Sequence, residues 1–147
     1  AVANVLICLF GYPASVNIFS WYFDFKNLPY LCNWVAFISA TCGFIAIISI
    51  SFMSFLTFKG ITAFRVPEAN DKSWIIFVVL IWVFSIFLAI PPFFGWNRFI
   101  PMESGVGCHP DWVSQSTLDV SYILFIVVGG FFVPLIIICY CNVMVNR

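Results

Sequence analysis

The sequence predicts an all-α membrane protein, and three observations support this fold class. The chain is 63% hydrophobic and 8% charged, whereas soluble domains are about 25% charged. Phe accounts for 19 of its 147 residues, which adds more apolar surface than a soluble chain of this length could cover. Four runs without Asp, Glu, Lys or Arg are each long enough to cross a bilayer core of about 30 Å. These runs are Ala1–Phe23, Asn27–Phe58, Ser73–Asn97 and Val120–Asn146.

Composition and charge also narrow the function classes. The formal net charge is zero, so nucleic acid is not an expected partner, whereas the lipid bilayer is. The one histidine, His109, lies in a loop without a partner for nucleophilic or zinc chemistry. We therefore expect neither an enzyme nor a metal site. The first run has no Met and no basic residues, and the chain stops just after another apolar run, so we expect a piece of a longer protein rather than a signal peptide.

We expect one transmembrane domain over residues 1–147, with approximate spans 1–20, 30–58, 73–93 and 118–145. In the first span, Gly11-Tyr12-Pro13 indicates either a kink or simply a helix end. The run Asn27–Phe58 would extend over roughly 48 Å as a helix, so it can cross the bilayer with tilt. Its many small and hydroxyl-bearing residues let neighbouring helices approach closely. We therefore expect a central helix that other helices surround.

The distribution of basic residues predicts the orientation of these spans, because successive spans place their connecting loops on alternate sides. The loop 59–72 and the C-terminal end carry Lys59, Arg65, Lys72 and Arg147. The loops 21–29 and 97–119 carry only Lys26 and Arg98. The positive-inside rule therefore places the loop 59–72 in the cytoplasm and the other two loops outside.

Proline and glycine indicate where the last two spans are interrupted. Pro91-Pro92 should end the third helix and turn the chain into the loop 97–119. The glycines and prolines of that loop predict a hairpin or an irregular segment. In the last span, Gly129-Gly130 and Pro134 favour a locally opened helix. The paired glycines would make room either for a neighbouring helix or for a ligand.

The six cysteines form two groups. Cys32 and Cys108 lie outside the apolar interiors, on the predicted extracellular side, where disulfides persist. By position they could form a bridge that holds the loop 97–119 over the central helix, or they could be two free thiols. The other four are expected to be reduced packing residues within the spans: Cys8, Cys42, Cys139 and Cys141.

The loop 97–119 and the residues before it carry a family resemblance. The order is Trp82, Pro91-Pro92, Gly95-Trp96-Asn97-Arg98-Phe99-Ile100-Pro101, Cys108 and Asp111-Trp112. In this order the chain resembles an animal opsin, of the rhodopsin-like class of G-protein-coupled receptors. The resemblance covers nearly the whole chain. It implies a fragment of a seven-transmembrane helix bundle, from late helix 2 to helix 5.

The resemblance implies roles for individual residues. Cys32 and Cys108 match the family disulfide. Arg98 and Asp111 match an ion pair that closes a hairpin plug over retinal, unless they are two solvated loop charges. Retinal is the implied cofactor, and its attachment lysine would lie on helix 7, outside this chain. Its pocket would be lined by residues that would otherwise be ordinary packing positions: Ser39, Ala40, Gly43, Phe44, Trp112, Gly130 and Phe131.

Two departures from the family pattern bear on function. A buried protonated Schiff base needs a nearby carboxylate, but Val35 and Met102 stand where the family would place one. Our hypothesis is that Glu103 is the counterion, unless it is a solvated loop glutamate. The Glu/Asp-Arg-Tyr triplet at the inner end of helix 3 is replaced by Leu56-Thr57-Phe58, which argues against coupling to a G protein.

The first functional prediction is an opsin-type light receptor, in a plasma or photoreceptor membrane, that binds retinal and signals through a G protein. The absent triplet favours a second reading, a photoisomerase-like opsin without G-protein output. The chain could also belong to a receptor of the same fold for a diffusible ligand, or to a structural or degenerate membrane protein. A lysine on helix 7 would separate the opsins from the last two classes, because Lys26, Lys59 and Lys72 lie in or next to loops.

Overall fold

The computed structural model describes residues 29–63, 73–102 and 107–145. Several sequence predictions lie outside these described residues: the span 1–20 with Cys8, residues 21–28 of the first loop, and Glu103. The elements in chain order are α3 (Pro29–Ala63), α4 (Ser73–Ala89), the 3₁₀ helix η2 (Pro91–Phe94), strands β1 (Phe99–Pro101) and β2 (Cys108–Pro110), α5 (Thr117–Val127), the π-helical turn η3 (Val128–Phe132) and α6 (Val133–Val145).

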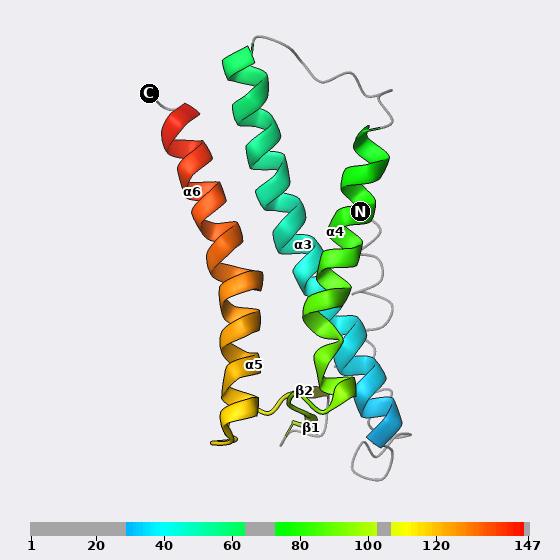
Figure 1. The fold of residues 1–147 in the computed structure, drawn as a ribbon. Coiled ribbons are helices and arrows are strands. Elements are labelled where there is room, and N and C mark those ends of the chain that lie inside the picture. The colour runs from blue at the N-terminus through cyan, green and yellow to red at the C-terminus, as the bar shows by residue number, and fades with distance from the viewer. Residues whose placement is uncertain (1–28, 64–72, 103–106, 146–147) are drawn as a thin grey trace.

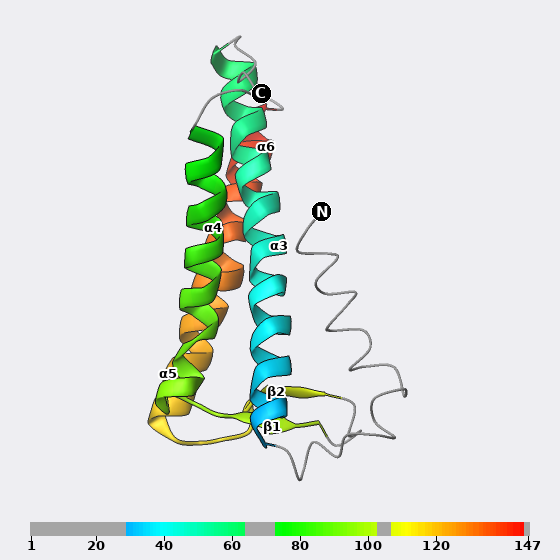
Figure 2. The ribbon, with the colours of Figure 1, turned by 90° about the vertical axis from the view of Figure 1, so that its right-hand side faces the viewer.

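In the described part of the chain, the helices form three long columns (Figure 1). α5, η3 and α6 make one continuous column, which packs along α3 mainly through α6. α4 also packs on α3, and it meets the α5–α6 column at α5 and η3. The strands β1 and β2 lie across the N-terminal end of α3 (Figure 2). α3 thus has the central position predicted for the run Asn27–Phe58.

Two helical segments among the described residues are long and apolar enough to cross a membrane, Tyr30–Thr62 and Thr117–Val145. α4 adds a shorter apolar segment, Ile75–Ala89. The crossing of the bilayer at the four approximate spans stays a prediction.

α3 extends beyond the expected end of its span at Phe58. The prediction that Lys59 begins a loop is wrong, because the helix continues through Lys59 to Ala63. Thr62 helps to close this last turn by donating its hydroxyl to the Phe58 carbonyl at 2.9 Å. A lysine can occupy such a turn because its apolar stem lies along the helix while its ammonium group reaches the interface.

Pro91-Pro92 ends α4, as the sequence predicts, and creates an acceptor that joins α4 to α5. Proline has no N–H, so the Leu88 carbonyl, four residues before Pro92, has no donor within its own helix. The Tyr122 hydroxyl of α5 donates to this carbonyl at 3.2 Å. η2 then carries the chain onward and ends at Gly95, whose φ of 83° is left-handed.

We expect Tyr122→Phe to destabilise the fold by about 1 kcal/mol, because it leaves the Leu88 carbonyl without a donor where water is scarce. The Tyr122 side chain is 1% exposed, so its ring should remain packed. Unfolding of the protein in detergent measures the loss. Tyr140→Phe is the matched control, because Tyr140 is 57% exposed. Equal stability of the two variants would contradict a stabilising role for the Tyr122–Leu88 bond.

The last column contains the local opening that its glycines and proline predict. η3 is a π-helical turn directly before α6. A Cβ on Gly130 would lie 2.8 Å from Cδ1 of Phe44 on α3, and closer still to Cε1. A Cβ on Gly129 would lie 3.2 Å from Cδ2 of Leu88 on α4. Of the two roles open to the paired glycines, the structure supports close approach of neighbouring helices.

Candidate functional site

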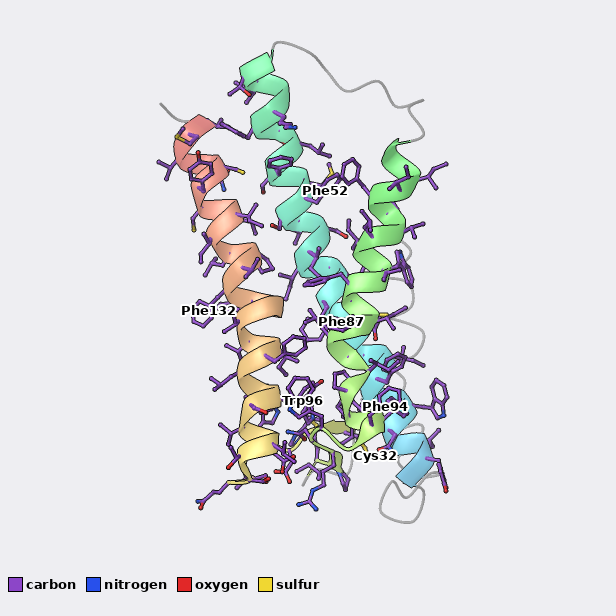
Figure 3. All side chains as sticks on the ribbon, viewed as in Figure 1. Cys32, Phe52, Phe87, Phe94, Trp96 and Phe132 are labelled. Atoms are coloured by element: carbon purple, nitrogen blue, oxygen red, sulfur yellow. A yellow bond between two sulfur atoms is a disulfide. The ribbon has the colours of Figure 1, made fainter. Side chains whose placement is uncertain are left out.

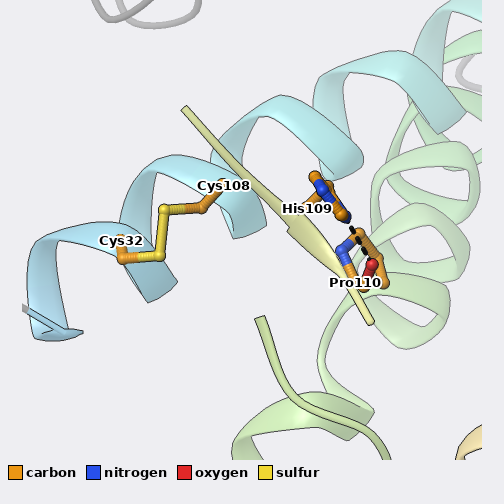
Figure 4. The surroundings of a disulfide bond; sticks show 4 residues. All are labelled: Cys32, Cys108, His109 and Pro110. Atoms are coloured by element: carbon orange, nitrogen blue, oxygen red, sulfur yellow. Dashed lines mark hydrogen bonds between the residues drawn. A yellow bond between two sulfur atoms is a disulfide. The ribbon is translucent and has the colours of Figure 1, made fainter. Parts of the chain in front are cut away.

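A short antiparallel hairpin is fixed to the outer end of α3. β1 and β2 pair with Pro101 opposite Cys108. Cys108 forms a disulfide with Cys32 in the first turn of α3, and their Cα atoms are 5.5 Å apart (Figure 4). Cys32 is 2% exposed and packs with Val35. The implied disulfide is confirmed, and it attaches the hairpin covalently to the central helix.

The remaining described cysteines are free thiols. Cys42 and Cys141 are buried, as expected of packing residues. Cys139 is exposed on α6, so the prediction that it packs within the bundle is wrong for the described part of the chain. Helical phase explains the difference, because residues two apart on a helix point in very different directions.

Asn97 joins the start of the loop to its end. Its φ of 77° lies in the left-handed region, which asparagine tolerates better than most residues. Its Nδ2 donates to the carbonyls of Asp111 at 3.2 Å and Asp119 at 3.4 Å. Its Oδ1 accepts from the backbone N–H groups of Arg98 and Asp111. This one buried amide therefore connects the hairpin to the first turn of α5.

Arg98 and Asp111 form the ion pair that the resemblance implies. Oδ2 of Asp111 accepts from Nη2 of Arg98 at 3.0 Å and from Nε at 3.1 Å. Oδ1 accepts from the N–H groups of Val113 at 3.2 Å and Ser114 at 3.0 Å. The Arg98 side chain is 73% exposed, so attraction between the charges alone would contribute little. The bonds to the backbone distinguish Asp111 from a solvated loop charge.

Asp111 should make the stability of the loop depend on pH. Burial raises the pKa of Asp111. Three other effects outweigh it: the bond from the Arg98 side chain, the bonds from the Ser114 and Val113 N–H groups, and the Arg98 charge. Together they hold the pKa of Asp111 below its ordinary value. A carboxyl with a lowered folded-state pKa stabilises the fold above its unfolded pKa of about 3.9. That contribution is lost as pH falls through the lower, folded-state pKa.

We expect Asp111→Asn to lower the unfolding temperature at neutral pH and to remove part of the acid sensitivity below about pH 4. Asparagine keeps an oxygen for the Val113 and Ser114 N–H groups but loses the charge that faces Arg98. Unfolding in detergent from neutral pH to about pH 3 measures both effects. Identical pH profiles of variant and wild type would contradict this role of Asp111.

Trp96 packs the beginning of the loop against α5. Its Nε1–H donates to Ser121 Oγ at 2.8 Å, and its ring stacks on Phe125 with centroids 5.3 Å apart. Trp96 lies between the hairpin and α5 (Figure 3). In the sequence, Trp96 and Asn97 stand out only as members of the motif that resembles the opsins. The motif does not predict which residues they contact. The tolerance of asparagine for left-handed backbone is the one local signal at Asn97.

Six of the seven expected pocket residues lie on α3 and on the π-helical turn η3 that packs against it, and Trp112 lies in the loop. Phe44 and Gly130 are brought together, with the ring against the glycine. Gly43 is half-buried, and a Cβ there would meet nothing within 4 Å. The wall is therefore filled at Phe44 and open at Gly43.

The other four expected pocket residues are exposed, except for Ala40. On α3, Ser39 is exposed and Ala40 is half-buried. Trp112 in the loop and Phe131 in η3 are 52% and 51% exposed. Ser39, Trp112 and Phe131 are therefore not enclosed by the described residues. The proposed counterion Glu103 lies outside the described residues.

Comparison with known proteins decides the family. The family described as 7 transmembrane receptor (rhodopsin family) matches residues 1–147. The chain belongs to the rhodopsin family of seven-transmembrane receptors. It is therefore an integral, multi-pass membrane protein, and the predicted membrane fold and the resemblance to animal opsins are confirmed.

Proteins that are similar in sequence to this rhodopsin-family chain include rhodopsins and other opsins. A rhodopsin of Cambarus maculatus is 34% identical over 120 residues, covering 79% of this chain and 39% of that protein. The short-wave-sensitive opsin 1 of Mus musculus is 32% identical over 143 residues, covering 95% and 41%. The crystal structure of squid rhodopsin matches with a TM-score of 0.73 at 25% identity, covering 79% of this chain and 34% of that chain. The chain spans less than half the length of the curated relatives it matches.

The inner end of α3 in this rhodopsin-family chain is held by apolar and local contacts. Leu56-Thr57-Phe58 lies where the resemblance places the family triplet. Thr57 donates its hydroxyl to the Met53 carbonyl of its own helix at 3.0 Å. Phe58 meets Tyr140 of α6 edge-on, with ring centroids 6.2 Å apart. An aromatic contact thus joins α3 and α6 at Phe58, the tyrosine position of the triplet, while Thr57, at the arginine position, bonds only within its own helix.

Proposed function

We propose that this chain is part of a light receptor that binds retinal beneath the hairpin, in a plasma or photoreceptor membrane. The supporting observation is the covering loop. The Cys32–Cys108 disulfide fixes the hairpin to α3, and Asn97 fixes it to α5. A covered, apolar end of a bundle suits an apolar ligand that must be kept from water. The opsin relatives favour the same ligand.

The expected wall residues fit a polyene. None of the seven is charged, and Phe44, Trp112 and Phe131 are aromatic. The space beside Gly43 leaves room on α3 for a ligand. When bound, retinal would supply absorption of light and a change of isomer. The residues of this chain would hold it from α3 and the last column, and the hairpin would exclude water.

The test of retinal binding uses the full-length receptor, incubated with retinal and washed. A visible absorption band shifted from that of free retinal is expected, and Gly43→Trp, which fills the open wall position, should reduce it. Ile50→Trp on the exposed side of α3 is the matched control, because Ile50 is 60% exposed. Absence of the band would contradict the proposal and favour a receptor for a diffusible ligand.

We further propose that Glu103 balances the charge of the linkage between retinal and its lysine on helix 7. The helix-3 position that could hold a carboxylate is filled by Val35, which packs against the disulfide. Glu103→Gln should shift the absorption maximum and lower the pKa of the linkage. Glu68→Gln, on the predicted cytoplasmic side, is the control. An unchanged spectrum and pKa in Glu103→Gln would contradict the proposal.

The proposed output is a change in packing at the cytoplasmic ends of α3 and α6 that a G protein reads. Light-dependent nucleotide exchange by heterotrimeric G proteins is the direct assay. A photoisomerase without this output is a second candidate, favoured because Thr57 and Phe58 present no charged group there. Release of more than one changed retinal per receptor under light, without nucleotide exchange, would support the second candidate and contradict the first.

A further inference from the structure

A groove of about 530 Å³ lies between α3, α4 and α6. It exists because α4 packs on the last column at α5 and η3 and diverges from α6 beyond them (Figure 1). Phe52, one of its wall residues, lies in the half of the bundle away from the disulfide (Figure 3). The groove is therefore separate from the expected retinal pocket. Its volume is within the range of ligand sites, about 300–1,000 Å³.

The walls of the groove are largely apolar; Ser51 and Tyr140 also line it, and Ser51 donates its hydroxyl to the Pro134 carbonyl. α3 contributes Ile48 and Phe55, α4 contributes Ile81, and α6 contributes Ile137. No charged side chain lines it among the described residues. A polar ligand would lose its hydration here and gain few polar partners. A hydrocarbon chain has no polar groups whose hydration would be lost, and it would fill the groove.

A cation marks the inner end of this groove. Nζ of Lys59 lies 5.3 Å from the centroid of the Phe55 ring, which is part of the wall. From Lys59 to Ile48, α3 rises about 16 Å. That distance is about half of the ~30 Å hydrocarbon core of a bilayer. The groove thus has the depth of one leaflet, with its cation at the level of the headgroups.

We propose that the groove binds an acyl chain of an anionic phospholipid from the cytoplasmic leaflet, whose headgroup pairs with Lys59. The Cys32–Cys108 disulfide marks the opposite end of α3 as extracellular, so Lys59 faces the cytoplasmic leaflet. Anionic lipids concentrate in that leaflet and attract basic residues near its surface. Because the occupant would contact α3, α4 and α6 together, it would bias the position of α6.

Lipid retention by the full-length receptor tests the headgroup contact. The receptor is reconstituted in vesicles of equal parts phosphatidylcholine and phosphatidylserine and extracted gently, and the lipids that stay bound are measured by native mass spectrometry. Wild type should retain phosphatidylserine over phosphatidylcholine by about fivefold, as expected for one lysine at a membrane surface. Lys59→Gln should reduce this ratio towards one, and Lys59→Arg should preserve it.

Filling the groove tests the site of the acyl chain. Ile137→Trp should abolish retention of the bound lipid, and Ile81→Phe should do so from the opposite wall. Leu135→Trp is the matched control, because Leu135 is on the same helix, is 40% exposed and does not line the groove. Unchanged phosphatidylserine retention in both filled variants would overturn the proposal. So would a wild type without bound lipid, which would indicate that another helix covers the groove.

Discussion

Replacement of Cys32 or Cys108 by serine should destabilise the fold by about 4.5 kcal/mol. The disulfide joins positions 76 residues apart. In the chain-entropy account, a cross-link of this span restricts the unfolded chain by that amount. The folded state would lose its covalent attachment between the hairpin and α3 as well. We expect a larger loss here than for Tyr122→Phe, Asp111→Asn or Gly130→Ala.

Thermal unfolding of the full-length receptor in detergent, with and without reductant, measures this loss. We expect the same lowered unfolding temperature for Cys32→Ser, Cys108→Ser and the double variant. Reductant should not change the unfolding temperature of any of the three. Wild type should become equivalent to them when reduced. Cys139→Ser removes a free, exposed thiol and is the matched control. A wild-type unfolding temperature in the Cys32→Ser variant would mean that Asn97 and the Arg98–Asp111 pair hold the hairpin unaided.

Gly130→Ala should destabilise the fold by about 1–3 kcal/mol, although alanine is the better helix former. Its methyl group would lie 2.8 Å from Cδ1 of Phe44 and closer to Cε1, so the ring or the helix must move. Gly43→Ala is the matched control on α3, because its methyl group would meet nothing within 4 Å. That control should stabilise the fold by about 0.4–1 kcal/mol.

A double-mutant cycle separates the contact from other effects of Gly130→Ala. Phe44→Leu removes the ring edge that faces the glycine, so Gly130→Ala should cost less in that background than in wild type. The unfolding free energies of the four proteins measure this coupling. Strictly additive losses would show that Phe44 is not what limits the residue at position 130.

Local chemistry explains which parts of the fold were predictable. Pro91-Pro92 lacks N–H groups in any context, so the end of α4 follows from sequence alone. The disulfide could be predicted because the two cysteines share the extracellular side and match the family pattern. Lys59 was not predictable as helical, since a lysine at a membrane boundary suits a loop or a final helical turn equally well.

The partners of buried groups depend on tertiary contacts and could not be predicted. Tyr122 bonds to the Leu88 carbonyl only because α5 lies beside α4. The sequence leaves open whether Gly130 faces a ligand or a helix, because a missing side chain does not specify what fills its space. In the structure, the Phe44 ring of α3 fills the space beside Gly130. The candidate pocket remains a set of predicted positions, since Ser39, Trp112 and Phe131 are exposed in the described part of the chain.

The π-helical turn η3 also determines which side of α6 faces its neighbours. From α5 into the start of α6, the buried positions recur every fourth residue: Tyr122, Ile126, Gly130 and Pro134. In an α-helix each step of four overshoots a full turn by about 40°, so three steps would displace the stripe by about 120°. The wide turn at Val128–Phe132 compensates by about 100°, the rotation of one residue. Loss of one residue there would rotate all of α6 although every side chain of α6 stayed the same. A length change in this turn would therefore act at the cytoplasmic end as a rotation of the helix.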